Sequence, residues 1–181
     1  MNRALHDAIL AIKRAEGSQS VFFGRQLEDP RVGVLAVVWS SVEAAASLTL
    51  QSYGTTGRKV LPLAPRSGAV ASLQAGATEV FTGYGVEPGF EANVRDFAKK
   101  LDAESPPGYH GGAVGAAVAL GRREEGYSAD DGEEVKLVIG WDSKEAHLRA
   151  KDEPGAIKDN IHLLRTLRKK VDMWHVNFEE Q

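Results

Sequence analysis

Histidines are the side chains of this 181-residue chain best suited to proton transfer, because only histidine has an unperturbed pKa near neutrality. His147 falls at the edge of the buried side of a predicted helix, where it could be a general acid or base or could pack the helix onto a sheet. His175 shares one face of a predicted C-terminal strand with Asn177, so it either borders a polar cavity or is structural. We predict His147 and His175 as catalytic residues and Asn177 as a substrate contact.

A strand made largely of Gly, Ala and Val, residues 109–121, is the best indication of a cavity. Its small side chains either allow closer packing or leave volume for a ligand. The polar pair Tyr109 and His110 opens this strand, and we predict a catalytic role for Tyr109 and a place at the pocket mouth for His110. Four aromatic residues are predicted to line the pocket: Phe81, Tyr84, Trp141 and Trp174.

Neither a metal ion nor an organic cofactor is predicted. The chain has no cysteine, and no histidine pair or histidine-carboxylate pair sits on one element at metal-ligand spacing. The glycine-rich segment 108–112 precedes a strand, whereas a phosphate-binding loop must open a helix. No Ser-His-Asp set can be chosen from the sequence. The expected ligand is a hydrophobic small molecule.

The segment that positions His147 is the clearest structural signal in the chain. The aliphatic run from Val135 to Trp141 predicts a strand, in which Gly140 allows a close backbone approach. Ser143 is a good N-cap for a helix that runs from Lys144 to Asp152. We therefore expect His147 on a helix that begins directly after a buried strand.

A second copy of this segment lies upstream, at a constant offset of 102 residues from Trp39 to Trp141. The copy has a strand, a tryptophan and the N-cap Ser41, but Ala45 stands where the downstream copy has His147. Internal similarity of this kind predicts two copies of one supersecondary unit. The two units are expected to be structurally equivalent but chemically unequal.

The downstream unit, residues 77–181, reads strand, helix, strand, strand, helix, strand, which is the order of a ferredoxin-like unit. The upstream unit, residues 1–76, begins with a helix and lacks the opening strand. Its last part, after a short strand around Lys59 to Leu63, is predicted to be a linker to Gly76. The charged segment 122–134 is expected to be a long exposed hairpin connection.

A family resemblance rests on Gly140–His147, Asn160–Leu164 and Met173–Phe178. These segments resemble fungal tandem-repeat proteins of the antibiotic-biosynthesis-monooxygenase-like superfamily of dimeric α+β barrels. The resemblance covers nearly the whole second half and, more loosely, residues 4–77. It implies an α+β fold in which two tandem ferredoxin-like units pack as one barrel, the first without its opening strand. Members of this superfamily include cofactor-independent oxygenases and polyketide cyclases.

Composition limits the partners. A net charge of −3 argues against nucleic acid, and no segment approaches the ~20 apolar residues of a membrane span. The one basic run, Arg165–Lys170, is interpreted as cations at a helix C-terminus. We expect a cytoplasmic protein. The absent opening strand leaves a sheet edge exposed, which predicts a homodimer.

The first functional hypothesis is a cofactor- and metal-independent cyclase or isomerase of secondary metabolism, which folds a polyketide- or terpenoid-like substrate in an apolar pocket. The alternative is a cofactor-independent monooxygenase that oxidises a phenol- or quinol-type substrate. That reaction needs a base together with hydrogen-bond donors, and the sequence offers only Trp141, Asn177 and His175. A third hypothesis is a non-catalytic ligand-binding or assembly protein.

Overall fold

A computed structural model describes residues 3–48, 60–116 and 133–181. The helices are α1 (Arg3–Arg14), α2 (Val42–Ser47), α3 (Arg66–Gln74), α4 (Phe90–Glu104), α5 (Lys144–Asp152), α6 (Ala156–Asn160) and the 3₁₀ helix η3 (Ile161–Leu164). The strands are β1 (Ser18–Gln26), β2 (Gly33–Trp39), β3 (Ala77–Tyr84), β4 (Tyr109–Ala116), β5 (Glu134–Trp141) and β6 (Lys170–Glu180). The predicted hairpin connection 122–134 lies almost wholly outside the described residues.

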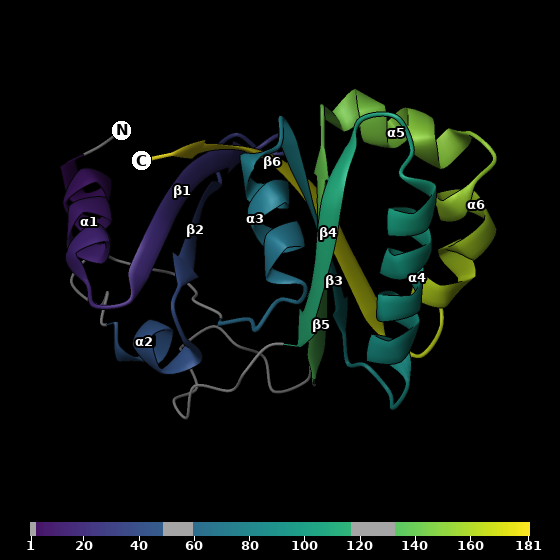
Figure 1. Cartoon of the computed structure of the whole chain (residues 1–181), viewed down its shortest axis with the longest axis horizontal. Helices are drawn as coiled ribbons and strands as arrows, with labels where there is room; N and C mark the ends of the chain where they lie inside the picture. Colours follow the sequence, from purple (N-terminus) through teal and green to yellow (C-terminus); the bar gives the residue numbers. More distant parts are fainter. Residues whose placement is uncertain (1–2, 49–59, 117–132) are drawn as a thin grey trace.

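The strands form one curled antiparallel sheet in the order β2-β1-β6-β3-β5-β4 (Figure 1). In the second half, β3 lies between β5 and β6, and β4 is the outer neighbour of β5. This arrangement, together with the order strand, helix, strand, strand, helix, strand, agrees with the ferredoxin-like unit predicted for residues 77–181. The hairpin of β1 and β2 extends the same sheet because β1 pairs with β6.

Helices cover both faces of this sheet. Helices α4, α5 and α6 lie on one face and α3 lies on the other (Figure 1). Side chains of β3 alternate accordingly, because successive residues of a strand point to opposite faces. Phe81 packs in the core with Phe97 of α4, whereas Val80 packs on the side of Ala69 in α3. Glu79 shares the face of Phe81 and is thereby directed toward α4 and α5.

The segment predicted to link the two halves contains helix α3. Its Ala, Ser and Gly residues resemble a linker in sequence, but their small size lets the helix approach the sheet closely. A Cβ atom at Gly140 would lie 2.8 Å from the Cα of Ser72, and one at Gly68 would lie 2.1 Å from the carbonyl oxygen of Gly112. Where a strand was predicted around Lys59 to Leu63, the described residues form isolated bridges at Val60 and Ala64, the latter with Val114.

The repeated strand-to-helix junctions have the predicted local structure. The hydroxyl of Ser41 accepts a hydrogen bond from the N–H of Ala44 at 3.1 Å. The hydroxyl of Ser143 accepts from the N–H of Ala146 at 3.2 Å. In each case a tryptophan at the end of a strand precedes a serine N-cap.

Among the described residues, no helix has the length and apolar character that a membrane span requires.

Candidate functional site

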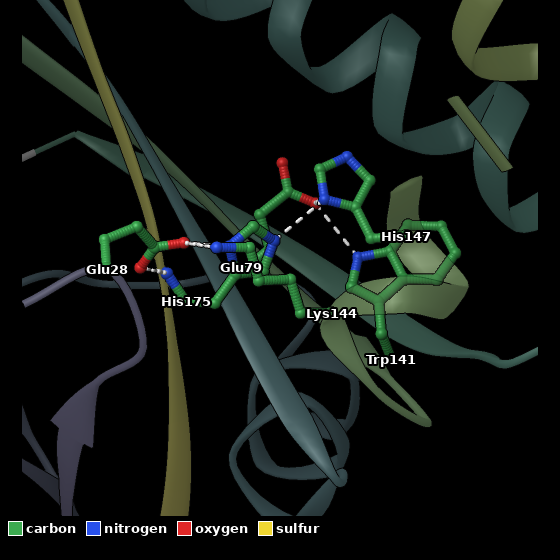
Figure 2. A network of polar contacts seen from close by, with 6 residues as sticks. All are labelled: Glu28, Glu79, Trp141, Lys144, His147 and His175. Atoms are coloured by element: carbon green, nitrogen blue, oxygen red, sulfur yellow. Dashed lines mark hydrogen bonds and ion pairs between the residues drawn. The ribbon is translucent and has the colours of Figure 1, made fainter. Parts of the chain in front are cut away.

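Two histidines, two glutamates and a tryptophan from separate elements meet between the sheet and α5 (Figure 2). Glu79 and His175 are paired residues of β3 and β6, so they lie side by side on the face covered by α5. The turn after β1, the end of β5 and the first half of α5 supply the other three. We call this set the histidine-glutamate network: Glu28, Glu79, Trp141, His147 and His175.

Glu28 fixes the orientation of His175. Its two carboxylate oxygens each lie 2.8 Å from a nitrogen of His175, one from ring Nδ1 and the other from the backbone N–H. Lys144 Nζ lies 2.8 Å from the same carboxylate. Partial burial raises the pKa of Glu28, but the hydrogen bonds from His175 and Lys144 lower it more, to about 2. Glu28 is therefore a carboxylate at neutral pH, and the proton between Glu28 and His175 resides on Nδ1.

The second ring nitrogen of His175 contacts His147. The distance from His175 Nε2 to His147 Nδ1 is 2.8 Å. Because His175 Nδ1 carries a proton, neutral His175 has a lone pair at Nε2, so His147 Nδ1 must donate the hydrogen bond. The lone pair of His147 then resides on Nε2, which points away from Glu79 and Trp141 (Figure 2).

The protonation state of His147 follows from its burial. Only 3% of the residue is exposed. Burial lowers the pKa of His147 to about 4; protonation of His175 would lower it further, and the positive charges of Lys151 and Lys144 also contribute. At neutral pH its ring is therefore an uncharged imidazole with a lone pair available for a proton.

Trp141 and Glu79 hold the ring of His147 in place. The indole of Trp141 is fully buried and stacks on the imidazole, with 5.3 Å between ring centroids and 19° between planes. Its Nε1–H donates a 2.9 Å hydrogen bond to Glu79, whose same oxygen lies 3.5 Å from His147 Nδ1. Burial raises the pKa of Glu79. Glu79 thus contacts both the indole of Trp141 and the imidazole of His147.

A cavity of about 220 Å³ adjoins this network. It lies between the sheet and the segments α4, α5 and 157–168, and His147 is on its wall. Its lining is mostly apolar: Phe81, Phe97, Ile139, Ile157, Ile161, Leu164, Val171 and Met173, with Glu79, Lys151, Arg165 and Arg168 as the other polar members. A hydrophobic molecule in this cavity would lie against a neutral imidazole.

The structure brings several of the predicted site residues together. His147 and Phe81 line the cavity, and His175 and Trp141 lie directly behind His147. Tyr109 packs edge-to-face against Trp141, with 5.6 Å between centroids, but its hydroxyl donates to Asp102 rather than into the cavity. Burial and the neighbouring carboxylate raise the pKa of the Tyr109 hydroxyl.

Four predicted substrate contacts do not line this cavity. Trp174 packs on the opposite, α3-covered face of the sheet. Tyr84 lies at the end of β3, where Lys170 Nζ is 5.4 Å from its ring centroid, and Asn177 is exposed. His110 lies 2.6 Å from the Asp142 carboxylate and lines a separate cavity of about 470 Å³ beside α3.

Sequence reasoning did not identify Glu28 or Glu79 as functional residues. Glu79 did carry a signal, because it shares strand parity with Phe81 and an acid on an apolar strand face is a candidate for a buried charge. Glu28 carried no comparable signal, because it reaches His175 across 147 positions of sequence.

The same network includes a possible metal site. Glu79, His147 and His175 each offer one donor atom, and these atoms lie within 4.8 Å of one another. Two imidazoles and a carboxylate are a common donor set for non-haem iron and for zinc. The sequence did not predict this set because its members come from three elements. The proton in the hydrogen bond between His147 Nδ1 and His175 Nε2 takes the place that a metal ion would occupy. The network can therefore hold either this proton or a metal ion.

Comparisons with known proteins address the fold. No family model and no curated protein matches the chain. The α+β fold of the chain is shared by several solved structures. A solved anthrone oxidase-like protein shares 18% identity and a TM-score of 0.66, over 98% of this chain and 84% of its own.

Two bacterial candidate monooxygenases have the same fold. The protein from Lactobacillus acidophilus shares 13% identity and a TM-score of 0.51, over 97% of this chain and 82% of its own. The protein from Fusobacterium nucleatum shares 9% identity and a TM-score of 0.56, over 98% of this chain and 84% of its own. At these identities the similarity establishes the fold alone.

Proposed function

We propose that this protein is a cofactor-independent monooxygenase that oxidises a phenol- or quinol-type aromatic molecule in the cavity beside His147. The observation that carries the proposal is the neutral imidazole of His147, which lines an apolar cavity and is linked through His175 to the carboxylate of Glu28. The solved structures with this fold support it, since they are described as monooxygenases or anthrone oxidase-like.

The first step is deprotonation of the substrate hydroxyl. His147 Nε2 accepts the proton while the proton on its Nδ1 passes to His175 Nε2, across 2.8 Å. The positive charge then resides on His175, where the Glu28 carboxylate stabilises it at 2.8 Å. The low pKa of His147 itself is no obstacle, because the proton does not remain in the buried cavity wall.

The second step is oxidation of the resulting anion by dissolved oxygen. The electron-rich anion gives one electron to O₂, and the radical pair forms a carbon–oxygen bond. The peroxide then takes up a proton from the network and loses water. For a substrate with a reactive CH₂ group, such as an anthrone in its phenolic enol form, the balance is CH₂ + O₂ → C=O + H₂O. The substrate itself supplies all the electrons.

This proposal reverses the ranking that the sequence favoured. The cyclase came first because Trp141, Asn177 and His175 formed an incomplete set for an oxygenase. The network adds His147 as a base facing the cavity and Glu28 as the carboxylate behind it. An apolar cavity with one proton-transferring group would also suit a cyclase, so the deciding measurement is the use of oxygen.

The test uses anthrone and 1-naphthol as probes, with oxygen uptake measured by electrode and the enzyme-free oxidation subtracted. We expect stoichiometric oxygen uptake and incorporation of label from ¹⁸O₂. His147→Gln should lower turnover by ~10²-fold or more without unfolding the protein. His162→Gln is the matched control, because His162 is exposed and outside the network. Turnover that proceeds equally without oxygen would contradict the proposal and favour the cyclase.

A further inference from the structure

Three cationic side chains line the otherwise apolar cavity: Lys151, Arg165 and Arg168. Within the described parts of the chain, none of them has a carboxylate oxygen within 4.0 Å. Of the described residues that line the cavity, Glu79 is the one acid; it is buried and accepts a hydrogen bond from Trp141. Among the described residues these three cations therefore have no ion-pair partner, although Lys151 does interact electrostatically with Glu79.

The three cations are more exposed to solvent than His147, which lines the same cavity. Lys151 and Arg165 are exposed, and Arg168 is half-buried. Two apolar residues of β6 on the cavity wall, Val171 and Met173, are 38% and 41% exposed, so the cavity opens to solvent on their side. We call this opening, with Lys151, Arg165 and Arg168, the cationic mouth.

One cation of the mouth, Lys151, lies on the same helix as His147. Lys151 follows His147 by four positions on α5, which places the two side chains one helical turn apart, about 5–6 Å between Cβ atoms. Arg168 is held by a 2.7 Å hydrogen bond from its Nε to the carbonyl of Leu164. Within the described ranges, that bond leaves its two terminal nitrogens without a protein hydrogen-bond partner, so they can meet a ligand.

We propose that the substrate of this cavity carries a carboxylate in addition to its ionisable hydroxyl, and that Arg165 and Arg168 bind the carboxylate at the cationic mouth while the hydroxyl lies against His147. Arginine presents paired N–H donors that match the two oxygens of a carboxylate. Only the position of the hydroxyl against His147 rests on the proposed function; the binding of the carboxylate does not. It gives a role to the basic run that the sequence alone explained as a helix C-terminus.

The experiment compares two probes by isothermal titration calorimetry at pH 7 and low salt: 1-naphthol and 5-hydroxy-1-naphthoic acid. The acid should bind at least about tenfold tighter, which is the effect of one charge-assisted contact. This preference should decrease with added salt. The double variant Arg165→Gln with Arg168→Gln should lose most of this preference, with Lys151 as the remaining cation of the mouth. Arg149→Gln is the control, because Arg149 is an exposed arginine of α5 that does not line the cavity.

The single variant Arg165→Gln is tested as well, in case the double variant misfolds, because Arg165 is exposed and its replacement should not affect folding. This single variant should reduce the preference for the acid by about threefold or more. Equal affinity of the two probes for the unmodified protein, no binding of either at millimolar concentration, or an unchanged preference in the variants would each overturn the inference. The readout is binding, so it is independent of oxygen use: a protein that prefers the acid but consumes no oxygen would refute the proposed function and leave this inference standing.

Discussion

The buried state of His147 makes a quantitative prediction about stability and pH. Its pKa is lowered on folding from 6.5 to about 4. Between these values the unfolded chain binds more protons at this position than the folded protein does, so folding stability decreases as the pH falls below 6.5. Lowering the pH from 7 to 5 should cost about 2 kcal/mol through this one residue.

The measurement is urea unfolding of the wild-type protein and of His147→Gln at pH 7 and pH 5. Glutamine does not titrate, and its amide can still donate to His175. The loss of stability on acidification should therefore be about 2 kcal/mol smaller in the variant. Glu28 and Glu79 have shifted pKa values too, but both are retained in the variant, so their contributions cancel in the comparison.

His162→Gln, at an exposed position, should lose stability on acidification as the wild type does. An equal loss in His147→Gln and the wild type would refute the reasoning, because it would mean that folding does not favour the neutral form of His147. Such a result would also remove the argument for His147 as a base, since that argument requires an uncharged ring in the cavity wall at neutral pH.

Three further predictions concern the network and its surroundings. Glu28→Gln should lower kcat by ~10²-fold and change KM little, because the amide cannot stabilise a cationic His175. Glu145→Gln, at an exposed position of α5, is the control in the same steady-state assay. Purified protein should contain no stoichiometric metal by elemental analysis and should keep its activity after dialysis against EDTA, whereas one ion per chain would make the network a metal centre. Gly140→Ala should destabilise the protein by ~1–3 kcal/mol in urea unfolding, because the added methyl would lie 2.8 Å from the Cα of Ser72 in α3; an unchanged midpoint would contradict this close packing.

Features specified by neighbouring residues could be predicted from the sequence. The strand, tryptophan, serine N-cap and helix around His147 depend on local periodicity and on one side-chain hydrogen bond, and the structure has them where they were expected. The order of elements in residues 77–181 follows from the same local patterns. Local patterns also identified His147 and His175, because histidine is chemically distinctive wherever it lies.

Composition was misleading where packing decides the structure. The Ala-, Ser- and Gly-rich segment before β3 resembles a linker because Val70 and Leu73 are the only large apolar residues of Arg66–Gln74. In the fold those small residues allow α3 to lie against Gly112 and Gly140, which only a sheet without side chains at these points permits. Whether this segment forms a helix therefore depends less on the helix propensity of its residues than on the sheet surface against which the helix packs.

The sequence by itself determined that a histidine would follow a buried strand on a helix and that a second would lie in the last strand. Only the tertiary structure decided that the two rings would meet at 2.8 Å, with Glu28 behind one and Trp141 against the other. The physical reason is register: the pairing of β3 with β6 sets Glu79 beside His175, and the turn after β1 brings Glu28 to the same residue across the sheet. Such long-range pairing leaves no periodic trace in any short stretch of sequence.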